Sequence, residues 1–126
     1  MGLFSVFTTN SGVIESDKLA DDFSRILTDI EEIEVGFRLK EDTFIFTNKR
    51  LILVEKLKED DKDIVYLTVP YSQISFFSVV SKKAFDSKAS LKIFLSGQTD
   101  PVINKEFNKS VDVYEVQKIL AGHVLK

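Results

Sequence analysis

The chain has 126 residues, the length of a single domain with one core, and 44% of its residues are apolar, as in ordinary globular proteins. Its formal charge of −3 comes from 17 basic and 20 acidic residues that are interspersed, so no general attraction for nucleic acid or anionic lipid is expected. The sequence contains no cysteine, which excludes disulfides, thiolate zinc sites and cysteine nucleophiles.

The first predicted element is an amphipathic helix over residues 16–30. Ser16 and Asp17 form a helix start, with a capping hydroxyl and a carboxylate near the positive end of the helix dipole. Its opposite face is rich in Asp and poor in Lys, so the helix is expected to pack on a sheet and not on a membrane surface. The apolar residues at helical spacing are Leu19, Phe23, Ile26, Leu27 and Ile30.

Residues 31–108 are predicted to form a bent sheet of seven antiparallel strands. The first strand has a period of two from Ile33 to Leu39. Residues 42–56 follow as a β-hairpin, in which two apolar runs flank the polar residues 47–50 and Asn48 supplies the positive φ of a tight turn. Because these two runs do not alternate, the hairpin sends apolar side chains to both faces of the sheet, and each face must be covered.

The second half of the chain predicts four further strands and a helix. The helix spans residues 110–125, with Ser110 as its cap. This order indicates a mainly β (α+β) fold, a strongly bent sheet or partly open barrel whose open end is capped by the C-terminal helix. The four strands are Ile64 to Val69, Ile74 to Ser81, Leu91 to Ser96 and Val102 to Asn108.

Several segments resemble the bacterial pleckstrin-homology (PH)-like domain family, and they occur in order over nearly the whole chain. The resemblance implies a PH-like partly open barrel with an additional N-terminal helix, in a stand-alone cytoplasmic protein with no known enzymatic activity. It also implies a tendency to assemble into cyclic homo-oligomers. The segments are Met1 to Phe4, Asp42 to Lys56, Val69 to Ile74, Leu91 to Gly97, Lys105 to Phe107 and Val111 to Leu120.

The apolar hairpin and two polar segments are the candidate interaction sites. Ile45, Ile52 and Val54 are the candidate oligomer interface, as outward apolar residues of the hairpin. The turn residues Asn48, Lys49 and Arg50 either serve turn geometry and solubility or contact a partner. A basic cluster either is solvated or binds an acidic partner or a lipid surface, and it consists of Lys82, Lys83, Lys88 and Lys92.

No motif in the sequence predicts catalysis, a metal or a cofactor. His123 is the only histidine, and a dipole or packing role at the end of the last helix explains it. The acidic residues at 31–34 are interpreted as solvated charges. We therefore expect a non-catalytic module that self-assembles into a ring and presents a polar surface to a protein partner. The alternative is a peripheral membrane module that binds anionic lipid through the basic cluster.

Overall fold

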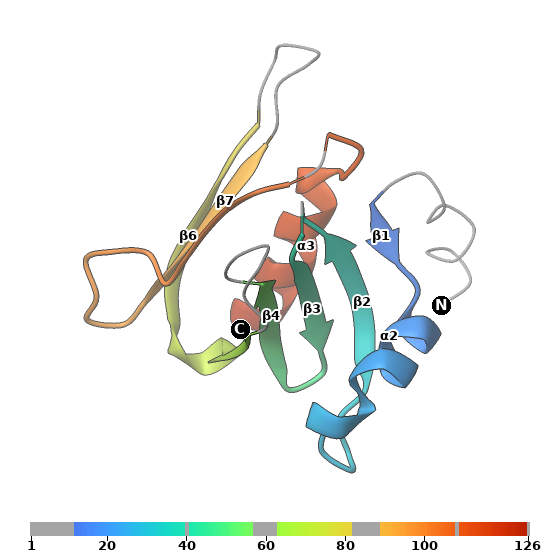
Figure 1. The fold of residues 1–126 in the computed structure, drawn as a ribbon. Helices are drawn as coiled ribbons and strands as arrows, with labels where there is room; N and C mark the ends of the chain where they lie inside the picture. Colours follow the sequence, from blue (N-terminus) through green and yellow to red (C-terminus); the bar gives the residue numbers. More distant parts are fainter. Residues whose placement is uncertain (1–11, 40, 57–62, 82–88, 108, 126) are drawn as a thin grey trace.

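The computed structural model of the chain describes residues 12–39, 41–56, 63–81, 89–107 and 109–125 (Figure 1). These residues form eight strands, two α-helices and two short 3-10 helices. In chain order the elements are β1 (Val13–Ile14), α2 (Ser16–Phe23), η1 (Ser24–Ile26), β2 (Ile33–Arg38), β3 (Thr43–Thr47), β4 (Arg50–Lys56), β5 (Ile64–Pro70), η2 (Tyr71–Gln73), β6 (Ile74–Val80), β7 (Ser90–Leu95), β8 (Ile103–Glu106) and α3 (Val113–Val124).

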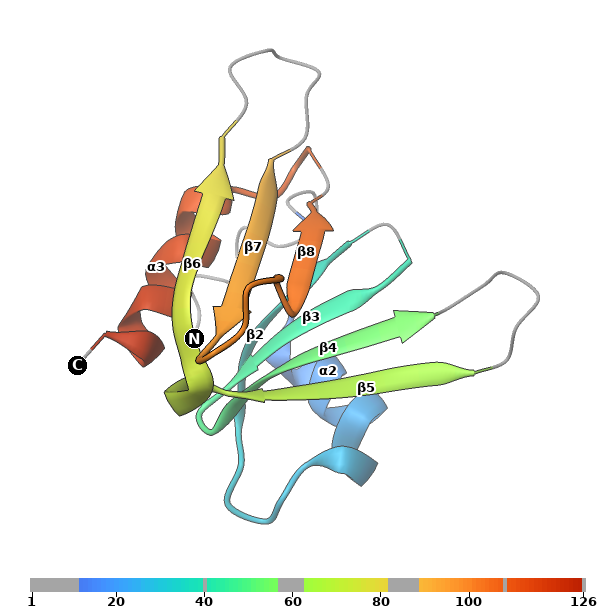
Figure 2. The same ribbon diagram turned by 90° about the vertical axis from the view of Figure 1, so that its left-hand side faces the viewer.

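The strands form two antiparallel sheets. One has the order β1-β2-β3-β4-β5, and the other has the order β6-β7-β8. Figure 2 shows that the strands of the smaller sheet run at a steep angle to those of the larger one. The seven strands predicted in residues 31–108 are β2 to β8, and β1 is a short additional strand that the sequence analysis did not predict. The mainly β fold with a C-terminal helix is confirmed.

The central hairpin of β3 and β4 is buried on both faces, as its apolar runs predict. Phe44, Phe46, Leu51 and Leu53 belong to a large core that the two sheets share with the apolar stripe of α3. The opposite face of the hairpin lies in a second, smaller core beneath α2 and η1. The smaller sheet and α3 therefore cover one face of the hairpin, and α2 with η1 covers the other, as its non-alternating apolar runs require.

Phenylalanine rings pack between the end of the smaller sheet and the larger sheet. Phe107, which follows β8, contacts Phe44 and Phe37 edge to face, at centroid distances of 5.8 Å and 6.4 Å. Phe44 makes a similar contact with Phe46 at 5.3 Å. Edge-to-face pairs add to the stabilisation from burial alone. This cluster holds the two sheets in a fixed relation in the middle of the core.

The N-terminal helix is shorter than the predicted span of 16–30. α2 ends at Phe23, and a 3-10 turn carries the chain to Leu27, which is extended. Its cap residue is Glu15, not Ser16, and no side-chain cap hydrogen bond forms there. The apolar spacing continues beyond Phe23, but hydrogen bonds to distant residues hold the following segment outside the helix.

Gly36 of β2 allows α2 to approach the sheet closely. A Cβ atom at this position would overlap the side chain of Leu19, which is 1% exposed and belongs to the core beneath α2. Glycine at this position thus follows from the contact between a helix and a strand, and not from a turn.

The C-terminal helix begins three residues after the predicted start. Its cap is Asp112, whose side chain accepts a hydrogen bond from the backbone N–H of Tyr114 at 3.0 Å. The prediction of Ser110 as the cap is therefore wrong. Asp and Ser are equally good capping residues, so the sequence alone did not distinguish the two positions.

Candidate functional site

The turn between β3 and β4 places Arg50 in an internal ion pair. Its Nε and Nη2 atoms lie 2.8 Å and 3.0 Å from the two carboxylate oxygens of Glu31. The guanidinium also donates to Oγ1 of Thr68 at 2.7 Å and to the carbonyl oxygen of Ile26. Arg50 therefore connects η1, the segment before β2, and β5, because its planar fork reaches all three. The structure places this candidate partner contact inside the protomer.

Glu31 is the buried member of this ion pair, with a side chain that is 0% exposed. Burial by itself raises the pKa of a carboxyl group, but hydrogen bonds from Arg50, Thr47 and Thr28 and the charge of Arg50 lower the pKa of Glu31 to about 2. The interpretation of Glu31 as a solvated charge is therefore wrong. Its partner is far away in the sequence, so no local pattern indicated the pair.

Asn48 does not adopt the predicted positive φ, which among the described residues occurs only at glycine. Instead, the hydroxyl oxygen of Thr47 closes the turn by accepting hydrogen bonds from the backbone N–H groups of Lys49 and Arg50, at 3.0 Å and 2.9 Å. Asn48 is thereby free to act as a partner for Glu32, and the two residues exchange hydrogen bonds of 2.8 Å and 3.0 Å. Lys49 lies exposed beside them.

His123 connects α3 to β2 and η2. Its Nε2 atom lies 2.7 Å from Oε1 of Glu34, and its ring stacks on Tyr71 with a centroid distance of 4.0 Å. The Tyr71 hydroxyl donates to the carbonyl oxygen of Thr47 at 2.6 Å, and burial raises the pKa of Tyr71. The packing role predicted for His123 is confirmed by this stack, and Glu34 is a partner that the sequence analysis missed.

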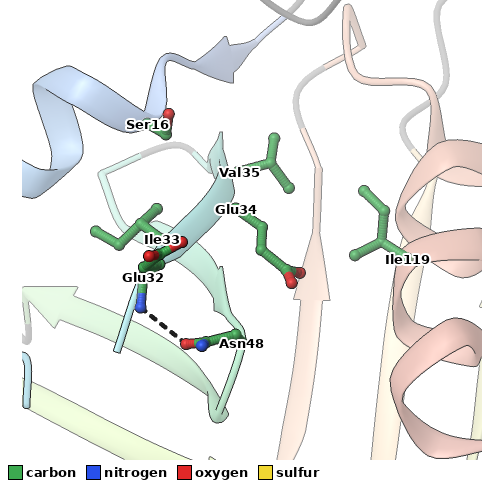
Figure 3. Close-up of a pocket in the computed structure, with 7 residues that line it drawn as sticks. All are labelled: Ser16, Glu32, Ile33, Glu34, Val35, Asn48 and Ile119. Carbon is green, nitrogen blue, oxygen red and sulfur yellow. Dashed lines mark hydrogen bonds between the residues drawn. The ribbon is translucent and has the colours of Figure 1, made fainter. Parts of the chain in front are cut away.

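A pocket of about 400 Å³ opens beside these residues, and we call it the β2 groove. Figure 3 shows Ser16 at the start of α2 on one side, Ile119 of α3 on the other, and residues of β2 between them. The Asn48 side chain, with its hydrogen bond to Glu32, closes one end. The groove is lined by Ser16, Glu32, Ile33, Glu34, Val35, Asn48 and Ile119.

Among the described residues, no strand pairs with one edge of β2 along this groove. β1 pairs only with Phe37 and Gly36, and the chain then leaves the sheet to begin α2. β3 pairs with the other edge of β2 from Ile33 onward, with a register shift between Ile33 and Val35. Within the described residues, the first half of β2 therefore has a strand on one side only.

The outer strands β5 and β6 provide two further open edges. Each lies at the end of its sheet and pairs with a single neighbour among the described residues. On β5, Ile64 and Tyr66 are 44% and 47% exposed, and on β6 Phe76 and Val80 are 54% and 44% exposed. The ring of Phe76 stacks on Phe94 of β7 at 4.3 Å. These two strands carry most of the large apolar side chains that the described surface exposes.

The predicted oligomer interface on the hairpin is not accessible. Ile45 and Ile52 are 0% exposed and Val54 is 7% exposed, because all three lie in the core beneath α2. The expectation that these side chains face outward is wrong, since the N-terminal helix covers this face of the sheet within the same chain. Self-assembly itself is a separate matter and stays a prediction.

The predicted basic cluster lies mostly outside the described residues. Lys82, Lys83 and Lys88 belong to the undescribed part, whereas Lys92 is exposed on β7. Elsewhere in the described chain, no three Asp, Glu, Cys or His side chains are grouped as metal ligands. None of the helices in those ranges is both long and apolar enough to cross a membrane.

Two antiparallel sheets at a steep angle, with a C-terminal helix packed in their shared core, define a PH-like module. The sequence matches the bacterial PH domain family over residues 2–124, and the chain belongs to this family. It is 36% identical to the uncharacterized protein YjqA of Bacillus subtilis (strain 168) over 122 residues, which cover 97% of this chain and 98% of YjqA.

Two solved structures support the same assignment. A DUF1696 family protein with a pleckstrin-homology domain from Shewanella loihica PV-4 is 40% identical and superposes with a TM-score of 0.80, over 92% of this chain and 98% of that one. A pleckstrin homology domain from Shewanella amazonensis SB2B is 38% identical, with a TM-score of 0.77, over 89% of this chain and all (100%) of that one.

Proposed function

We propose that this PH-like module is a non-catalytic cytoplasmic interaction protein that self-assembles into a cyclic homo-oligomer and presents a polar surface to a protein partner. The observation that carries the proposal is the apolar exposure of β5 and β6. Ile64 and Tyr66 on β5, and Phe76 and Val80 on β6, are each more than two-fifths exposed. Apolar side chains exposed on outer strands that have one free edge are typical of surfaces that bind another chain.

A second copy of the chain is the occupant that fits these strands. An outer strand presents unpaired backbone N–H and C=O groups, and another outer strand satisfies them. β5 and β6 are different surfaces of one protomer, joined only by η2. A contact between β5 of one copy and β6 of the next is head-to-tail, and such contacts generate a closed ring when the rotation between copies permits.

The test is the absolute mass in solution, measured by light scattering behind a sizing column over a wide concentration range. We expect a sharp multiple of the 14.3 kDa chain for the unchanged protein. Tyr66→Lys on β5 and Val80→Lys on β6 should each lower the mass, because a charge in the contact must be desolvated without a partner. If the contact is head-to-tail, mixing the two variants should restore a dimer through the remaining intact edges.

The matched control is Ile30→Lys, which places the same charge at an apolar residue that is 70% exposed but lies on neither β5 nor β6. Its mass should equal that of the unchanged protein. A monomeric unchanged protein at all concentrations would overturn self-assembly. An oligomer that both edge variants leave intact would place the interface elsewhere.

A further inference from the structure

We propose that the β2 groove is a docking site for an extended, positively charged peptide segment of a partner protein, which adds as a short strand to the open edge of β2. This inference rests on the partner-binding part of the proposed function and does not depend on self-assembly. It is carried by an unpaired strand edge, a pocket along that edge and two carboxylates that line the pocket.

The open edge selects a peptide over a compact ligand. Ile33, Glu34 and Val35 lie beyond the end of the pairing with β1. On the other side Ile33 and Val35 pair with β3, with a register shift at Glu34 between them. Backbone groups on an open edge hydrogen-bond readily to the backbone of an added strand, and this mode of recognition gives affinity independent of the peptide sequence. The added strand would continue the line of β1 where the chain itself turns away into α2.

The groove gives such a strand walls on both sides. Ser16 of α2 and Ile119 of α3 lie on opposite sides of β2 (Figure 3), and the pocket between them measures about 400 Å³. Successive side chains of an extended peptide point to opposite sides, so one set would face α2 and the other would face α3. Ile33, Val35 and Ile119 provide apolar contacts for its aliphatic parts.

The charges that line the groove favour a basic peptide. Glu32 and Glu34 are both exposed, and the described residues that line the groove include no lysine or arginine. His123 contacts Glu34 at 2.7 Å, and Lys49 and Lys118 adjoin the lining residues Asn48 and Ile119 in the chain. A peptide with Lys or Arg at alternate positions complements the two carboxylates, whereas an acidic peptide is repelled.

The experiment measures fluorescence anisotropy of a labelled, capped peptide of four Lys-Val repeats, titrated with the protein at low salt. Two comparison peptides separate the contributions: one has Glu in place of Lys, and the other is N-methylated at every residue, so that neither edge of the peptide can donate strand hydrogen bonds. We expect the Lys-Val peptide to bind about tenfold or more tightly than either, because the first loses charge complementarity and the second loses strand pairing.

Protein variants then locate the site. Glu32→Lys should weaken binding of the Lys-Val peptide about tenfold and improve binding of the Glu-Val peptide, since the charge of one groove wall is reversed. Glu32→Gln should have a smaller effect in the same direction. The matched control is Glu106→Gln on β8, which removes an exposed carboxylate from the other sheet and should leave the affinity unchanged.

Three results would overturn this inference: no binding of the Lys-Val peptide at millimolar protein, equal binding of the N-methylated peptide, or equal losses in Glu32→Gln and Glu106→Gln. The peptide titration is repeated on Tyr66→Lys, whose edge change lies on β5. Binding retained by a monomeric Tyr66→Lys protein would show that the groove works without assembly. A protein that keeps the mass of the assembly but does not bind the peptide would overturn the groove proposal and leave self-assembly standing.

Discussion

The open edge of β2 and the open edges of β5 and β6 differ in what surrounds them. The β2 edge is short, lies between two helices and is lined by Glu32 and Glu34. The outer strands are longer and carry exposed apolar residues such as Tyr66 and Phe76, although α3 lies beside β6 and Phe23 of α2 contacts Tyr66. A backbone edge is the same chemical group in both places, so the side chains around it decide which strand it accepts.

This difference assigns the two kinds of edge to two kinds of partner. An apolar outer strand such as β5 or β6 binds an apolar outer strand of a second copy, because burial of apolar area favours association without any charge pattern. The acidic edge between two helices favours a narrow basic segment over a second copy of β5 or β6, because those strands contain no cation to pair with Glu32 and Glu34. Changes at one edge should then leave the other unaffected.

The largest expected effect comes from Arg50, which bonds to residues at both regions: Glu31 before β2 and Thr68 on β5. Arg50→Met should lower the free energy of unfolding by about 3–5 kcal/mol, because Glu31 is left as a buried charge without its partner. Denaturant unfolding at a fixed protomer concentration measures this loss. Peptide binding and assembly should both weaken, since both edges lose their shared support.

The control for this change is Lys49→Met, at the exposed neighbouring position. It removes the same unit of charge and should alter the unfolding free energy by less than about 0.5 kcal/mol. Comparable losses in the two variants would mean that the internal ion pair of Arg50 does not stabilise the fold.

The pH dependence of stability tests the same ion pair through Glu31. Its pKa is about 2 in the folded chain and 4.5 when unperturbed, so the folded state binds the proton less readily than the unfolded state. The stabilisation is complete above about pH 4.5 and is lost as the pH falls toward 2, with a total of about 3 kcal/mol. Unfolding free energies measured between pH 7 and pH 2 check this.

In Glu31→Gln the group that titrates is absent. The difference in stability between this variant and the unchanged protein should therefore shrink as the pH falls. A difference that stays constant from pH 7 to pH 2 would contradict a lowered pKa for Glu31.

Gly36→Val changes the contact between α2 and β2 beside the β2 groove. The new side chain would overlap Leu19 and push α2 away from β2, which should lower the unfolding free energy by about 1–3 kcal/mol. The start of α2 forms one wall of the β2 groove, so peptide binding should fall, while the mass in solution should not change. Gly122→Ala in α3 is the contrasting change, because no atom lies near its Cβ position and alanine favours a helix.

The regular elements were predictable because their signals are local. The period of two in β2 and the unbroken apolar runs of β3 and β4 set both the strands and the need for two covers. The end of α2 was not predictable, since Ile26 continues the helical spacing but its carbonyl accepts a hydrogen bond from Arg50, 24 residues away. Tertiary contacts of this kind override local propensity.

The candidate site was less predictable than the fold. Ser16, Glu34 and Ile119 come from three elements, and nothing in their spacing indicates that they line one pocket. The hairpin residues Ile45 and Ile52 were expected at an interface because the sequence shows that they are apolar but not which element covers them. Burial under the chain's own helix and burial under a second copy give the same apolar pattern.

The smallest expected change, and the finest test of the comparison, is the response to salt. Raising NaCl from 50 mM to 500 mM shortens the distance over which charges act, so binding of the Lys-Val peptide at Glu32 and Glu34 should weaken several-fold. The mass of the assembly should stay the same, because contacts through Tyr66 and Phe76 are apolar and salt doesn't screen them. Anisotropy and light scattering on one preparation measure both. If the assembly dissociated in parallel with the peptide, charge would govern both kinds of edge, and the difference between them would not lie in the side chains that surround the backbone.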